Sequence, residues 1–90
     1  MALLDLLGRR WSLRILWELR DGPATFRVLQ AQCDGVSPTV LNDRLKELRE
    51  AGILEARADV GYATTTSGAA LLRALAPLQT WAIAWAKNVS

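Results

Sequence analysis

The 90-residue sequence contains no histidine and only one cysteine, Cys33. A single cysteine excludes an internal disulfide. Without histidine the chain cannot form Ser–His or Cys–His nucleophilic pairs, or a zinc site built from His and Cys. A Gly-rich phosphate-binding loop is missing as well. These absences predict a protein that is not an enzyme and that uses no metal or cofactor.

Long apolar runs are also missing. No stretch approaches the ~18 consecutive apolar residues of a transmembrane helix. In the opening segment MALLDLLGRR, Asp5 interrupts the apolar residues, and the basic pair follows them instead of preceding them. This is the wrong order for a signal peptide. The sequence therefore predicts a cytoplasmic protein with no membrane segment.

Apolar residues, in contrast, make up 51% of the chain and include four tryptophans. A domain of this size buries only about 60–65% of its unfolded surface. The surplus therefore suggests a second apolar surface, such as one covered by a partner subunit; the alternative is that the tryptophans only fill the core. Nine arginines and two lysines give a net charge of +2. The guanidinium group suits phosphate, so this composition is compatible with nucleic acid without establishing it.

Apolar periodicity predicts four helices, a β-hairpin and a last helix. The expected helices cover residues 2–7, 12–20, 26–33, 38–51 and about 66–88, and the expected strands cover 53–58 and 62–65 around a turn at 59–61. Two short helices joined by a turn and followed directly by a hairpin form the winged helix-turn-helix arrangement. The sequence thus predicts a single domain over residues 1–90, mainly α with a small β-hairpin.

Capping residues mark where these helices begin and end. Ser12, Thr25 and Ser37 are expected N-caps, and Gly52 is the expected C-terminal stop of the fourth helix. Pro77 lies inside the last helical pattern, and we expect it to kink that helix or to divide it in two.

The fourth helix has one apolar and one polar face. On a helical wheel Leu41, Leu45 and Leu48 form a narrow stripe that predicts burial. The outward face near the helix start carries groups that can donate and accept hydrogen bonds at base edges, namely Thr39, Asn42, Asp43 and Lys46. The alternative is a solvated face with Asp43–Lys46 and Lys46–Glu50 pairs at helical spacing. The preceding helix and the following hairpin favour a reading helix, because the first turns of such a helix enter the major groove.

Several motifs together resemble the HxlR-type transcriptional regulators, a winged-helix group related to the MarR family. They are Gly8, the Arg10-Trp11 pair, the pattern IL.EL.DGP..F..L over residues 15–29, SP.VL..RL.EL.EAG over 37–52, Tyr62, and residues 65–68. The resemblance implies a homodimer on a palindromic operator, with the helix after Ser37 in the major groove and the hairpin as the wing. The family usually carries a cysteine ahead of its first helix and a longer wing. Here the only cysteine is Cys33, expected to be buried with Phe26 and Leu29 and therefore not to act as a redox switch.

Candidate DNA contacts follow from this arrangement. Thr39, Asn42 and Lys46 form the base-reading set, and Asp43 is a fourth candidate. The capped helix starts at Thr25 and Ser37 offer backbone amides to phosphate. Arg27 is a candidate phosphate clamp, and Arg57, near the wing tip, is a candidate contact to the backbone or the minor groove. Arg10 is expected either to touch phosphate or to pack on Trp11, and Arg44 is expected to pair with an acid of a neighbouring helix.

The two terminal helices, about 2–7 and 66–88, are the candidate dimerisation elements. The expected interface residues are Leu3, Leu7, Leu75, Leu78, Trp81 and Trp85. The alternative is that Pro77 folds the terminal segment back, so that both tryptophans cover the chain's own core. The sequence thus predicts a sequence-specific DNA-binding regulator whose partners are double-stranded DNA and a second copy, with any small-molecule effector unidentified. The alternative function is a winged-helix protein-interaction module that does not bind DNA.

Overall fold

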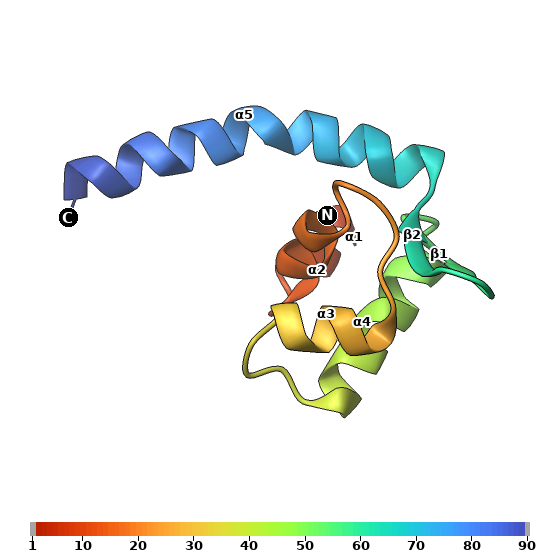
Figure 1. Cartoon of the computed structure of the whole chain (residues 1–90). Coiled ribbons are helices and arrows are strands. Elements are labelled where there is room, and N and C mark those ends of the chain that lie inside the picture. The colour runs from red at the N-terminus through yellow and green to blue at the C-terminus, as the bar shows by residue number, and fades with distance from the viewer. Residues whose placement is uncertain (1, 90) are drawn as a thin grey trace.

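The computed structural model describes residues 2–89 and contains five helices and one two-stranded hairpin within that range. The elements are α1 (Ala2–Leu7), α2 (Ser12–Glu18), α3 (Phe26–Gln32), α4 (Pro38–Glu50), β1 (Leu54–Arg57), β2 (Gly61–Thr64) and α5 (Thr66–Val89) (Figure 1). The predicted order and the mainly α class with a small hairpin are confirmed. The expected domain of residues 1–90 extends one residue past the described range at each end.

Two of the three expected N-caps are confirmed. The Thr25 hydroxyl accepts a hydrogen bond from the Val28 amide at 3.2 Å, and the Ser37 hydroxyl accepts one from the Val40 amide at 3.1 Å. The expectation for Ser12 is wrong. The residue before α2 is Trp11, in a left-handed conformation with φ of 80°, and no side chain caps this helix. The sharp turn at Trp11 carries Ser12 inside the first helical turn, where it is fully buried.

The core lies where α2, α3 and α4 meet. The predicted stripe of Leu41, Leu45 and Leu48 is at most 1% exposed and packs with apolar residues of the two other helices, including Ile15 and Leu29. Burying each such side chain stabilises the fold by about 1.5–3 kcal/mol. These contacts fix which side of α4 faces inward, and therefore which side faces solvent.

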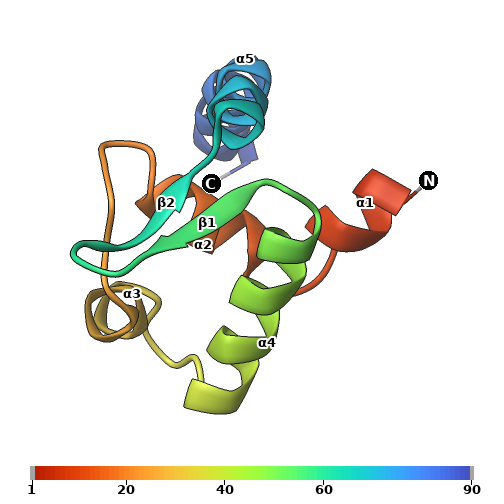
Figure 2. The ribbon, with the colours of Figure 1, turned by 90° about the vertical axis from the view of Figure 1, so that its right-hand side faces the viewer.

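The hairpin is antiparallel, with Leu54 opposite Thr64 and Arg57 opposite Gly61; β1 is two residues shorter than expected, and β2 has the expected length but begins one residue earlier. It is joined to the segment before α3. The amide of Ala24 donates to the Tyr62 carbonyl at 2.9 Å, and the amide of Tyr62 donates to the Ala24 carbonyl at 2.8 Å. Only glycine fits at position 61, because its φ is 98° and a Cβ there would lie 2.5 Å from the Ala24 carbonyl oxygen. Figure 2 shows the hairpin beside α4, and Figure 1 shows its turn extending away from the helices.

Helix α5 runs without interruption from Thr66 to Val89, so Pro77 does not divide it in two; of the two expected outcomes, only a bend is compatible with the arched helix of Figure 1. Pro77 has no backbone N–H to donate to the carbonyl of Arg73, four residues earlier. Both residues are exposed, so water can donate to that carbonyl instead. The helix arches over the body of the molecule and its second half extends beyond it (Figure 1). None of the helices within residues 2–89 has the length and hydropathy needed to cross a membrane.

The first half of α5 is anchored, and the second half is not. The Thr65 hydroxyl donates to the Gly52 carbonyl at 2.6 Å and accepts from the Gly68 amide at 3.1 Å. Leu71, Leu72 and Leu75 then pack against the core. Trp81 and Trp85 remain 60% and 52% exposed. The alternative in which they cover the chain's own core is therefore wrong.

Candidate nucleic-acid interface

The outward face of α4 presents the expected polar groups to solvent. Thr39, Asn42, Asp43 and Lys46 are all exposed. Neither of the expected pairs, Asp43–Lys46 or Lys46–Glu50, is among the ion pairs formed within residues 2–89. The buried leucines hold this face outward while its side chains stay available to an external partner.

Helix α3 brings a second pair of candidates to the same end of the molecule. Thr25 and Arg27 are exposed at its start, and no ion pair in the described part of the chain involves Arg27. The helix has only seven residues, and the Thr25 hydroxyl already accepts the Val28 amide. The structure therefore leaves Arg27 as the cationic group at this helix start.

Arg57 lies at the end of β1, where the hairpin turns, and it is not an isolated cation. Its guanidinium contacts the Glu55 carboxylate at 3.1 Å, and both side chains are about half exposed, at 47% and 46%. Such a pair at the surface contributes little, about 0–1 kcal/mol. Arg57 can therefore leave Glu55 for a phosphate at small cost.

An open groove separates α4 from the hairpin. Its polar lining includes Asn42, Lys46, Arg49 and Glu55, with Tyr62 on the hairpin side. Sequence reasoning gave Arg49 no role, although it lies seven residues after Asn42 and therefore on the same side of the helix. That spacing is the signal that could have identified it. The groove thus holds two basic side chains, Lys46 and Arg49, between the reading helix and the wing, together with the acids Glu50 and Glu55.

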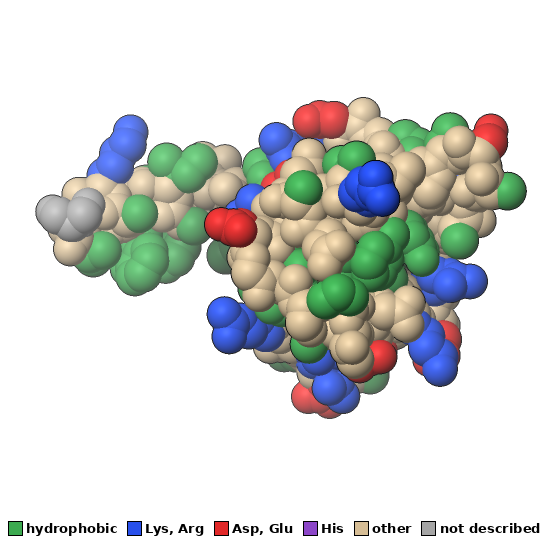
Figure 3. Space-filling model, turned by 60° about the horizontal axis from the view of Figure 1, so that its bottom comes forward, with side chains coloured by type: hydrophobic (Ala, Val, Ile, Leu, Met, Phe, Trp, Pro, Cys, Tyr) green, Lys and Arg blue, Asp and Glu red, His purple; other side chains and the backbone are tan. Residues whose placement is uncertain are grey.

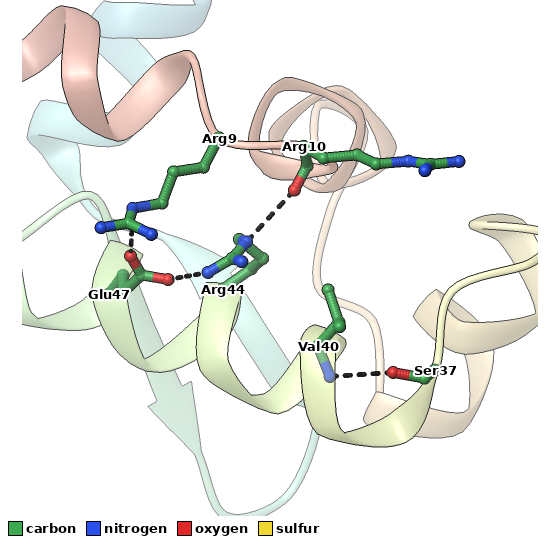
Figure 4. Close-up of polar contacts among 6 residues, drawn as sticks. All are labelled: Arg9, Arg10, Ser37, Val40, Arg44 and Glu47. Carbon is green, nitrogen blue, oxygen red and sulfur yellow. Dashed lines mark hydrogen bonds and ion pairs between the residues drawn. The ribbon is translucent and has the colours of Figure 1, made fainter.

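Arg44 and Arg10 have structural partners (Figure 4). Arg44 was expected to pair with an acid of a neighbouring helix, but it pairs with Glu47 of its own helix, one turn later. Its Nε also donates to the Arg10 carbonyl at 3.2 Å. The Arg10 guanidinium lies 5.3 Å from the centre of the Trp11 ring, which is the packing alternative foreseen for this residue.

The charge on this end of the molecule is mixed. Figure 3 looks onto the side formed by α3 and the start of α4, where Lys and Arg side chains stand around the rim with Asp and Glu among them. The net charge is only +2. Attraction of a polyanion would therefore depend on particular arginines and lysines more than on a uniform positive field.

The candidate dimer residues fall into two groups. Leu3, Leu78, Trp81 and Trp85 are exposed, between 42% and 60%. The two indole rings stack with centroids 5.9 Å apart. Leu7 is 9% exposed and Leu75 is half-buried against the core, so both take part in the packing of their own chain. Of the candidate dimer residues, the exposed ones thus lie mainly on the second half of α5, which carries apolar side chains where it projects from the body (Figure 3).

Cys33 is buried, as expected, with 1% of its surface exposed. Burial raises the pKa of its thiol above the ordinary value of 9.0; the charge of Arg14 lowers the pKa by a smaller amount, and the charge of Glu18 raises it slightly further. A protonated, enclosed thiol is a poor nucleophile. Cys33 therefore serves as a small apolar residue of the core.

Known proteins share this arrangement along nearly the whole chain. The HxlR-like helix-turn-helix family matches residues 6–90. Two HTH-type transcriptional regulators of Bacillus subtilis are similar: YvaP is 32% identical over 90% of this chain and 81% of its own length, and YodB is 35% identical over 87% of this chain and 75% of its own. The crystal structure of quinone-bound YodB aligns with a TM-score of 0.83 and 36% identity, covering 90% of this chain and 91% of that one.

A possible HxlR family transcriptional factor from Thermoplasma volcanium aligns with a TM-score of 0.87 and 29% identity, covering 96% of this chain and 83% of that one. The helix-turn-helix of α3 and α4, the hairpin after it and the long last helix are thus common to this chain and to these regulators. The chain belongs to the HxlR-like helix-turn-helix family and is a transcriptional regulator with a winged-helix fold.

Proposed function

We propose that this regulator binds double-stranded DNA directly and reads its sequence with α4. The observation that carries the proposal is the outward face of α4. Its hydrogen-bonding side chains are exposed and have no ion-pair partners within residues 2–89, while the opposite side of the same helix is fully buried. Thr39, Asn42 and Lys46 are assigned to base edges in the major groove, with Asp43 as an acceptor for a cytosine amino group.

The phosphate contacts come from elements on both sides of α4. Arg27 is assigned to the backbone beside α3, and the amides at the capped helix starts after Thr25 and Ser37 add neutral donors. Arg57 is assigned to the backbone or minor groove beside the wing, and Arg49 to the backbone between α4 and the hairpin. The proposed role involves no catalytic activity. It places the regulator in the cytoplasm, where the DNA is.

We also propose that two copies associate through their terminal helices and bind a palindromic operator. The support is the second half of α5, which projects from the body and on which Leu78, Trp81 and Trp85 are each between 52% and 60% exposed. An apolar groove between α2 and α5, lined by residues such as Leu13 and Trp17, continues this surface. Two-fold pairing places the two copies of α4 about 34 Å apart, one turn of DNA, which is the spacing that a palindromic operator requires.

The experiment measures binding to random and selected duplexes over a range of salt concentrations. A DNA-binding regulator releases counterions, so the logarithm of its affinity falls linearly with the logarithm of the salt concentration. Selection from random sequence should yield an inverted repeat. No retention on any duplex at low salt would support the alternative, a winged-helix module that docks proteins.

A further inference from the structure

Helix α4 is attached to the connection between α1 and α2 by directional polar contacts. Arg9, in that connection, places its Nε 2.8 Å from one carboxylate oxygen of Glu47. The other oxygen of Glu47 accepts from Arg44. Arg44 in turn donates from its Nε to the backbone carbonyl of Arg10 at 3.2 Å. Figure 4 shows these contacts as a chain that leaves α4 and returns to it through two neighbouring residues of the connection.

The position of Glu47 separates it from the reading surface. Glu47 is about 140° around the helix from Asn42 and about 100° from Lys46, although it lies only about 40° from Asp43, one turn earlier. Its side chain is 27% exposed and that of Arg44 is 17% exposed, whereas the reading residues face solvent. Both carboxylate oxygens are engaged by guanidinium groups, an arrangement that fixes direction as well as distance. Glu47 is therefore placed to orient the helix and not to contact a base.

The connection that receives these contacts has little freedom of its own. The Gly8 amide closes α1 on the Leu4 carbonyl at 2.8 Å, and a Cβ on Gly8 would lie 2.8 Å from that same oxygen. Trp11 holds a left-handed conformation that non-glycine residues rarely adopt. The Ser12 amide bonds back to the Arg9 carbonyl at 3.2 Å. A change in the direction of α1 is therefore transmitted to Arg9 and Arg10, and through them to α4.

We propose that Glu47 is a positioning residue that fixes the angle of α4 relative to α1, and thereby the spacing between the two half-sites of the operator. The inference rests on the proposed function, in which α1 belongs to the dimer surface and α4 reads DNA. Leucine packing alone permits small rotations of α4, because apolar contacts have no direction. Thr39, at the reading end of α4, lies eight residues or about 12 Å before Glu47. A rotation of about 15° about Glu47 thus moves the reading end by roughly 3 Å, the rise of one base pair.

The test selects duplexes in which two inverted half-sites are separated by spacers of different length. It compares the full-length wild type with Glu47→Gln and with Glu50→Gln as the matched control. Glu50 is an exposed acid of the same helix that makes no ion pair within the described residues, so both variants lose one negative charge near DNA. Both should therefore gain non-specific affinity to a similar extent.

The wild type and Glu50→Gln are expected to select one spacer length sharply. Glu47→Gln is expected to keep the base preference within each half-site but to accept spacers one base pair longer or shorter. Its preference for the best spacer should fall about three- to fivefold, the scale of one part-exposed ion pair. Arg9→Gln, which leaves Glu47 and Arg44 in contact, should relax the spacing in the same direction, and the two substitutions together should not add.

The outcomes separate the inference from the proposal beneath it. If the wild type selects a sharp spacing and folded Glu47→Gln and Arg9→Gln retain it, the positioning role is overturned while DNA reading stands. If the wild type itself selects single half-sites, the positioning role and the two-copy operator are overturned while DNA reading stands; if it selects no sequence, DNA reading is overturned as well. Thermal unfolding of each variant confirms that the buried leucine core is intact. If Glu47→Gln does not fold, the spacing selected by Arg9→Gln decides the question.

Discussion

Replacing Trp81 and Trp85 together by alanine should convert a dimer into a monomer. A buried tryptophan removes about 150–250 Å² from water. The 60% and 52% of these side chains left exposed therefore correspond to roughly 80–150 Å² each. At about 25 cal/mol per Å², covering one of them contributes about 2–4 kcal/mol. Four such side chains meet in a two-fold dimer, so the double substitution removes on the order of 10 kcal/mol of favourable burial.

That loss is comparable to the whole association free energy of a micromolar to nanomolar dimer, about 8–12 kcal/mol. Sedimentation at micromolar concentration should give about twice the chain mass of 9.9 kDa for the wild type and the chain mass for the variant. Val28→Ala with Val60→Ala removes exposed apolar groups away from the terminal helices and serves as the control. A wild-type monomer, or a tryptophan double variant that remains dimeric, would refute the reasoning. Specific DNA affinity should fall far more than non-specific affinity in the double variant.

Three further predictions concern the reading surface, the thiol and the hairpin. Asn42→Ala should weaken binding to the cognate site by about 1–3 kcal/mol and relax the preference at one base position per half-site. Arg27→Ala should instead weaken binding to all DNA sequences alike and reduce the slope of log affinity against log salt concentration by about one. Titrations on matched duplexes measure both effects. Because burial raises the pKa of Cys33, its protonated form stabilises the fold through neutral pH, and this contribution declines as the pH rises above 9.0; thiol labelling at pH 7 should be slow, and loss of DNA binding on mild peroxide treatment that Cys33→Ser abolishes would contradict this. Gly61→Ala should lower the thermal midpoint more than Gly35→Ala, since both have positive φ but only position 61 places a Cβ against the Ala24 carbonyl; equal effects would argue against the steric explanation.

Local signals in the sequence predicted the parts of the fold that depend on neighbouring residues. The caps at Thr25 and Ser37, the stop at Gly52 and the buried side of α4 each depend on a few residues in one segment. These patterns were sufficient for the class and for the order of the elements. The same local logic failed at Ser12, because the chain turns at Trp11 in a left-handed conformation that a capping pattern does not predict, and Ser12 is then the first residue inside the helix.

Contacts between distant segments were not predictable in this way. Pairing of Ala24 with Tyr62 joins residues far apart in the chain, and no periodicity announces it. The partner of Arg44 was misjudged because the wheel gives directions around one helix but not which backbone carbonyl lies beside it. The expected division of α5 at Pro77 assumes the cost of a lost hydrogen bond in a helix interior, which is smaller where the position is exposed to water. Arg49 was overlooked because the groove that gives it a role exists only once the hairpin folds beside α4.

The pairing of Ala24 with Tyr62 also bears on how the molecule meets a duplex. It joins the wing, close to its turn, to the residue just before Thr25, so the segments that carry Arg27 and Arg57 are linked by two backbone hydrogen bonds. In the proposed complex these two arginines contact the phosphate backbone at a separation that the protein sets. Such a fixed separation favours DNA whose groove width already matches it, or DNA that deforms easily. Base pairs that no side chain touches, between the reading helix and the wing, should therefore still influence affinity through the stiffness of the duplex.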